Sequence, residues 1–165
     1  MRTPSECAVF AGDLGLPVVI SLQHSIPHEN VWYGGDIEVL ERAMKLCPKT
    51  VFIGPAQSFW AEISGDEKAT TELRPAGKIS PRGNLIRLFE HYPNLYCDIS
   101  AESGRVALSR DPNFTVGGLQ TYCDRILFAR DNLKNAHLEL LHSYNFPKDV
   151  LNKIFYQNAQ RLIMK

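Results

Sequence analysis

A catalytic metal requires about three nitrogen or oxygen ligands close together, and few side chains in this sequence have the right type and spacing. His24, His28 and Glu29 lie near one another in the run SLQHSIPHEN and could form a ligand set on a loop. The alternative is that they are solvated residues of a loop beside Pro27. We keep His24 as a candidate metal ligand and leave both interpretations open.

Asp131 is a second candidate, at the end of the apolar run RILFARDN. The adjacent guanidinium of Arg130 is always charged and could hold the Asp131 carboxylate ionised as an ion pair. An aspartate between a strand and a helix also commonly caps the N-terminus of that helix. The residues alone are compatible with a helix cap and with a catalytic carboxylate.

Asp98 and Ser100 alternate with Cys97 and Ile99, so their polar side chains point to the same side of a predicted strand. From that side both could contact a substrate. The alternative is a buried Asp98 that is satisfied by neighbouring backbone groups or by Arg105.

The segment from Gln57 to Gly83 is rich in prolines, glycines and mixed charges, which predicts an extended loop on the face that carries the site. Trp60 and Phe59, near the start of this segment, could close over an aromatic or carboxylated small molecule. Alternatively, these two rings cover a hydrophobic end of the fold.

The other histidines and the cysteines lack the spacing of a metal or redox site. His137 and His142 are five apart in a predicted helix and do not share a face, and His91 is expected near a helix C-terminus. Neither a zinc knuckle nor a thioredoxin-like motif can be built from the cysteines. We predict buried thiols in a reducing compartment for them: Cys7, Cys47, Cys97 and Cys123.

Short apolar runs alternate with amphipathic segments along the chain. Pro147 is placed to open the last helix, with one apolar stripe formed by Val150, Leu151, Ile154, Phe155, Leu162 and Ile163. Four runs rich in branched and aromatic residues predict strands: Pro17–Gln23, Thr50–Gly54, Leu95–Ser100 and Arg125–Arg130. Apolar strands spaced about 30 to 45 residues apart indicate βα units around a parallel sheet.

Composition limits the size of the fold and its partners. The 165 residues, 44% of them hydrophobic, suffice for one domain but fall short of the roughly 250 residues of a complete β/α barrel. Lys plus Arg and Asp plus Glu number 18 each, so no net field would attract nucleic acid or anionic lipid. With no membrane-span or signal-peptide pattern, we expect a cytoplasmic protein without nucleic-acid or membrane partners.

Several motifs, taken in order, resemble the C-terminal half of the amidohydrolase-related family of metal-dependent hydrolases. They are the run VFIGPAQSFWAEISGD with its Trp and Ser-Gly-Asp, the run YPNLYCDIS, the run RILFARDN and the final NAQRL. The match extends from about Gly15 to Leu162. The resemblance implies a partial (β/α)8 TIM barrel whose four strands are the fifth to eighth, in a single domain (residues 1–165) truncated at its N-terminal side.

The resemblance also implies a site and an activity. The family hydrolyses small molecules with a divalent metal such as zinc or manganese, and it includes decarboxylases of small carboxylated compounds. Asp131 occupies the position of the family's eighth-strand aspartate, a metal ligand and general base. Ser21 and Pro55 stand where the family places histidines, and proline has no side-chain donor. A catalytically inactive remnant or binding module is therefore the alternative to a hydrolase.

Half a barrel implies a partner. Four parallel strands leave two unpaired edges, and one face of the sheet would be uncovered where the other half of a barrel packs. We expect either a homodimer or association with a separate N-terminal half, in addition to a small-molecule substrate if the protein is active.

Overall fold

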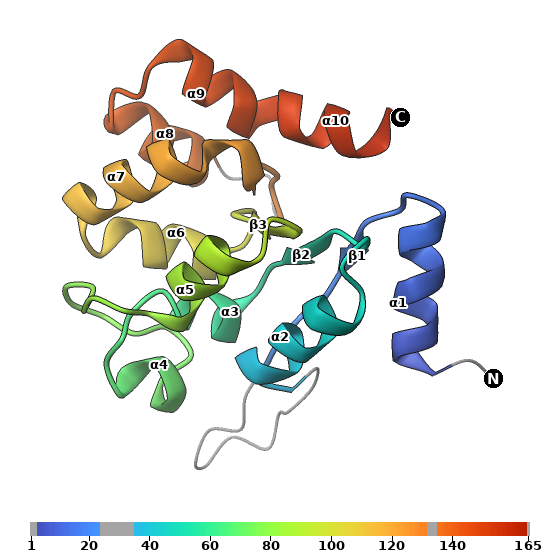
Figure 1. Cartoon of the computed structure of the whole chain (residues 1–165). Coiled ribbons are helices and arrows are strands. Elements are labelled where there is room, and N and C mark those ends of the chain that lie inside the picture. The colour runs from blue at the N-terminus through green and yellow to red at the C-terminus, as the bar shows by residue number, and fades with distance from the viewer. Residues whose placement is uncertain (1–2, 24–34, 132–134, 165) are drawn as a thin grey trace.

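The computed structural model describes residues 3–23, 35–131 and 135–164 of the chain. Its centre is a sheet of four parallel strands, whose order in space follows their order in the sequence (Figure 1). The strands are β1 (Val18–Val19), β2 (Phe52–Gly54), β3 (Leu95–Asp98) and β4 (Ile126–Leu127). Each lies inside a predicted strand, so the prediction of an α/β protein with a parallel sheet is confirmed.

Helices fill every connection between the strands. The helix α1 (Pro4–Asp13) precedes β1, and α2 (Ile37–Leu46) joins β1 to β2. Between β2 and β3 lie α3 (Gln57–Ala61), α4 (Lys68–Thr71) and α5 (Asn84–His91). Between β3 and β4 lie α6 (Glu102–Ser109), α7 (Pro112–Tyr122) and the 3-10 turn η1 (Cys123–Arg125). After β4 come α8 (Ala136–Ser143), α9 (Lys148–Asn152), the π-helical turn η2 (Lys153–Gln157) and α10 (Asn158–Ile163).

Local signals in the sequence explain where three of these helices begin. Thr3 closes a capping box at the start of α1. The Asp36 carboxylate accepts the backbone N–H of Val39 in α2, and Asp111 accepts that of Phe114 in α7. These side chains satisfy backbone donors that would otherwise have no partner inside the helix.

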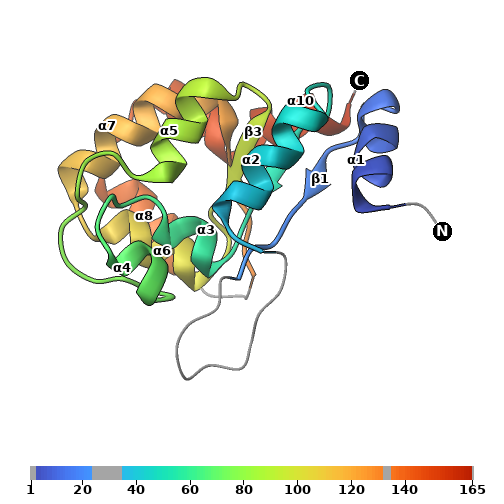
Figure 2. The same cartoon turned by 60° about the horizontal axis from the view of Figure 1, so that its bottom comes forward.

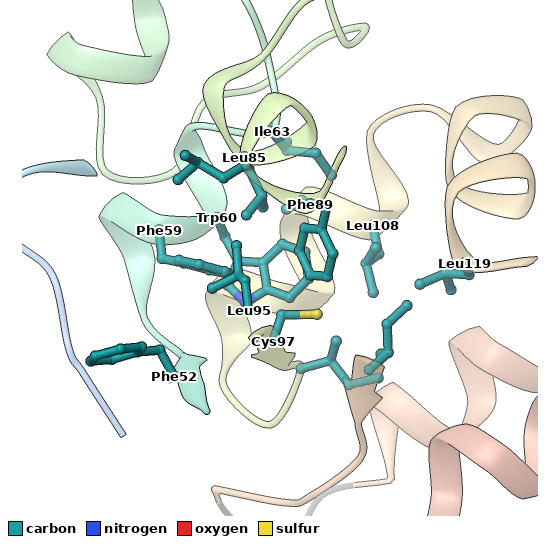
Figure 3. Close-up of a cluster of buried hydrophobic side chains, with 14 of the residues drawn as sticks. Phe52, Phe59, Trp60, Ile63, Leu85, Phe89, Leu95, Cys97, Leu108 and Leu119 are labelled. Atoms are coloured by element: carbon teal, nitrogen blue, oxygen red, sulfur yellow. The ribbon is translucent and has the colours of Figure 1, made fainter. Parts of the chain in front are cut away.

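One face of the sheet forms the main core with α2, α5 and α7, which follow one another along that side in Figure 2. Phe52 and Leu95 are partners in the register of β2 and β3, and Cys97 lies two residues after Leu95, so all three side chains point to this face. Figure 3 shows the side chains of Phe59 and Trp60 in the same cluster. A continuous apolar core therefore supports the strands from the helical side.

The segment Gln57–Gly83 differs from the extended loop that its composition predicts. It begins with α3, in which Phe59 and Trp60 are both buried, and it contains the short helix α4. The rings pack edge to face, with their centroids 5.7 Å apart. Their burial agrees with the alternative in which they cover the hydrophobic core, and the prediction of an extended loop is wrong for this part.

The C-terminal helices cover part of the opposite face. Leu162 of α10 packs there against Ile53 and Tyr96, and all three side chains are buried. Val19 of β1, which points to the same face, is 63% exposed. The prediction of an uncovered face is therefore wrong for β2 and β3, while at β1 the face is open.

Asn158 fixes this arrangement. Its Nδ2 atom donates to the carbonyl oxygens of Cys123 at 2.6 Å and of Ile126 at 2.8 Å, at the start of β4. Arg161 donates to the carbonyl of Asp124. Pro147 opens α9 as predicted, but the single apolar stripe is wrong at Ile163, which is 76% exposed. Val150, Ile154, Asn158 and Leu162 are buried at intervals of four residues across the π-helical turn, and Ile163 lies one residue away from this buried row.

We predict that Gly118→Ala raises the free energy of unfolding by about 0.5–1 kcal/mol in a denaturant titration. Gly118 lies inside α7 beside an apolar cavity of about 40 Å³, and a Cβ there would meet no packed neighbour within 4 Å among the described residues. Gly83→Ala is the matched control, because its Cβ would lie 2.2 Å from the Ile63 carbonyl oxygen. That variant should lose stability, and a loss in Gly118→Ala would contradict the packing described for α7.

Candidate functional site

Three candidate site residues, Asp98, Ser100 and Asp131, lie close together at the C-terminal ends of β3 and β4. The backbone N–H of Asp131 donates to the carbonyl oxygen of Ser100 at 3.4 Å. Asp98 and Leu127 are partners in the parallel register, two and four residues before these positions. Asp98, Ser100 and Asp131 therefore lie at one edge of the sheet, where side chains that follow adjacent parallel strands meet.

Asp98 is held by its own turn. Its Oδ1 atom accepts the backbone N–H of Ser100 at 2.6 Å, and the side chain is half-buried. Arg105 pairs with Glu102 instead. A backbone group thus bonds to Asp98, as one alternative expects, whereas Arg105 is paired with Glu102. Contact of Asp98 and Ser100 with a substrate stays a prediction.

Asp131 is exposed at the end of the strand that leads out of β4. The next described helix, α8, has Asn135 at its N-cap, so the prediction that Asp131 caps it is wrong. Within the described ranges, Arg130 donates from Nη1 to Asn135 Oδ1 at 2.8 Å rather than to Asp131. The Asp131 carboxylate is thus accessible from solvent.

Trp60 supports this edge from the core side. Its indole Nε1 donates to the backbone carbonyl of Asp98 at 3.0 Å, while the ring is only 4% exposed (Figure 3). The hydrogen bond fixes the end of β3 to α3. Contact between Trp60 and a substrate stays a prediction, since the buried ring is directed at the core.

The end of β2 has an unusual backbone. Ala56, directly after Pro55, has φ 80° and ψ 176°, a conformation that essentially only glycine adopts without strain. A Cβ at Gly54 would lie 2.1 Å from the Phe59 ring, so the ring packs directly on the strand backbone. The turn is held in place by this packing and by the backbone N–H of Trp60, which donates to the carbonyl oxygen of Ala56 at 3.2 Å.

The described residues do not fit the metal centre that the family resemblance implies. Ser21 is half-buried after β1, and Pro55 after β2 has no side-chain atom that can bind a metal. Within residues 3–23, 35–131 and 135–164, no group of three His, Cys, Asp or Glu side chains could hold a metal ion. His24, His28 and Glu29 lie outside the described residues. The donors at the described strand ends are carboxylates and hydroxyls rather than imidazoles.

Two buried titratable side chains are absent from the sequence-based candidates, and one of them, His137, lies beside this site. His137 Nε2 lies 2.8 Å from the carbonyl oxygen of Ala101, a contact that fixes α8 against the turn after β3. Glu62 accepts a hydrogen bond from Asn84 Nδ2 at 2.9 Å, and burial raises the pKa of its carboxyl group. Neither has a sequence signal, because each acts through a partner that is distant along the chain.

The remaining His and Cys predictions are largely met. His91 lies in the last turn of α5, where its Nδ1 is 2.8 Å from the Arg87 carbonyl oxygen. Three of the four free cysteines are buried, and burial raises the pKa of the Cys97 thiol strongly. Cys7 is exposed, so the prediction of burial is wrong for this residue.

Comparisons with family models, with curated proteins and with solved structures found no match to this chain. Among the helices that the structure describes, none is long and apolar enough to cross a membrane.

We predict that Ala56→Gly raises the free energy of unfolding by about 1 kcal/mol, because glycine removes the strain at this positive φ. Ala11→Gly, inside α1, is the control and should lower stability by a similar amount, since it changes a helix interior. Thermal and denaturant unfolding measure both. Equal losses in the two variants would show that Ala56 is not strained.

Proposed function

We propose that this chain is the half of an amidohydrolase-related β/α barrel that contains strands five to eight, and that it is a binding module for a small molecule. The observation that carries the proposal is the adjacency of Asp98, Ser100 and Asp131 at the C-terminal ends of neighbouring strands. In β/α barrels this end of the strands is where ligands bind. The consecutive strand order, which matches that of a barrel, supports the same assignment.

The chemistry of the edge favours a ligand with a cationic or hydrogen-bond-donating group. Asp131 offers an exposed carboxylate, and Asp98 has a second oxygen beyond the one that accepts the Ser100 N–H. The nearby positive charge of Arg105 is matched by Glu102. An amine or guanidine of a small molecule would therefore complement this edge better than a carboxylated compound.

Metal-dependent hydrolysis, or the related decarboxylation, is the second candidate function. The exposed carboxylate of Asp131 favours it, because this residue occupies the position of the family's metal ligand and general base. The other ligands for zinc or manganese would have to come from outside the described residues, either from His24 or from another chain. A second copy or a separate N-terminal half, pairing beside the exposed Val19 at the β1 edge, would be such a chain.

The test combines thermal unfolding with elemental analysis after size exclusion, on the wild type and Asp131→Asn. Asp149→Asn is the matched control, because Asp149 is an exposed aspartate in the first turn of α9. We expect small amines and guanidines from a probe panel to raise the midpoint of unfolding for the wild type and the control. Asp131→Asn should lose that rise, and all three samples should contain less than one metal ion per chain.

Two results would contradict the binding-module proposal. Stoichiometric zinc or manganese in the wild type that disappears in Asp131→Asn would favour the hydrolase. The elution volume of the wild-type protein would then show whether a dimer holds the metal. A ligand-induced rise that persists in Asp131→Asn would mean that binding occurs elsewhere on the chain.

A further inference from the structure

Two buried polar side-chain atoms lack a hydrogen-bond partner among the described residues: Ser103 Oγ and Arg110 Nη1. Ser103 is 5% exposed, and the Arg110 side chain is 3% exposed. Leaving a buried donor unpaired costs about 1–3 kcal/mol, and more for a charged group. Two such atoms in one region therefore point to a shared ligand.

Both residues line the same small cavity. Ser103 lies in the first turn of α6 and Arg110 is its C-cap, so they are seven positions apart and share one side of the helix. Side chains on a helix lean toward its N-terminus, which carries the long Arg110 side chain back toward Ser103. The cavity has a volume of about 10 Å³, and Trp60, Leu73, Arg74 and Pro75 are among its other lining residues.

The charge of Arg110 is already matched. Its Nε donates to the carbonyl oxygen of Gly77 at 2.9 Å and its Nη2 to that of Lys78 at 3.4 Å. Nη2 also lies 3.8 Å from Asp66 Oδ2. Because these partners already face the Arg110 guanidinium, and because an anion would lose its hydration in so small a cavity, the geometry favours a neutral ligand.

We propose that the cavity is a binding site for one water molecule. The water accepts a hydrogen bond from Arg110 Nη1 and donates one to Ser103 Oγ. A volume near 10–15 Å³ is about the smallest that holds a water molecule, so larger ligands are excluded. The water would satisfy the remaining donor of Arg110, the residue whose other guanidinium groups bond to Gly77 and Lys78 of the segment Gln57–Gly83. This inference is independent of the proposed function.

A high-resolution crystal structure of the full chain tests the proposal. We expect one isolated density peak at about 2.7–3.2 Å from both Ser103 Oγ and Arg110 Nη1. Ser103→Ala should weaken or displace the peak. Ser109→Ala should leave it unchanged, because the Ser109 hydroxyl is exposed and already donates to the Val106 carbonyl. No peak in the wild type, in a map that shows other buried waters, would overturn the proposal.

A bromide soak distinguishes water from an anion. An anomalous peak at the cavity would assign a halide and overturn the water site. In solution, a water-to-amide nuclear Overhauser effect at Ser103 that is lost in Ser103→Ala and kept in Ser109→Ala is the expected result. Equal signals in all three proteins would contradict the proposal without requiring crystals.

Discussion

Parallel sheets are usually buried on both faces, and in this chain the strands β2 and β3 meet that requirement while the second face of β1 is open. Helices α2, α5 and α7 cover one face with the main core. On the other face α10 brings Leu162 against Ile53 and Tyr96. Asn158 makes this possible, because its side chain bonds to two carbonyl oxygens around β4 and fixes where α10 begins.

The attachment of α10 and the candidate site lie at opposite ends of β4. Asn158 and Arg161 bond to Cys123 and Asp124, which precede β4, so α10 is attached at the N-terminal end of that strand. Asp131 follows β4 at its opposite end. The C-terminal edge can therefore carry exposed carboxylates without opening the contact between α10 and the sheet.

Much of the fold can be predicted from the sequence, because its signals are local. The apolar runs predict the positions of the four strands, and Pro147 predicts where the last helical region begins. The coverage of the second face could not be predicted, since it depends on contacts of Leu162 with Ile53 and Tyr96, which are distant along the chain. Phe59 and Trp60 were ambiguous for a similar reason: the composition around them is that of a loop, while their burial depends on contacts with β2 and β3.

The candidate site was predictable only in part. The alternation of Asp98 and Ser100 along a strand correctly placed both at the strand end, and the run before Asp131 placed that residue at the next one. His137 and Ala56 could not be found from the sequence. The first depends on a contact 36 residues away, and the second on a backbone angle that alanine does not normally adopt.

The arrangement depends most on α10, which covers the second face of the sheet over β2 and β3. Amide hydrogen exchange in Leu162→Ala tests it most directly, with Ile163→Ala as the control because that side chain is exposed. We predict that Leu162→Ala lowers protection of the Ile53 and Tyr96 amides by roughly tenfold or more, while Ile163→Ala leaves it unchanged. Unchanged protection in Leu162→Ala would contradict the account and leave this face of the sheet without its cover.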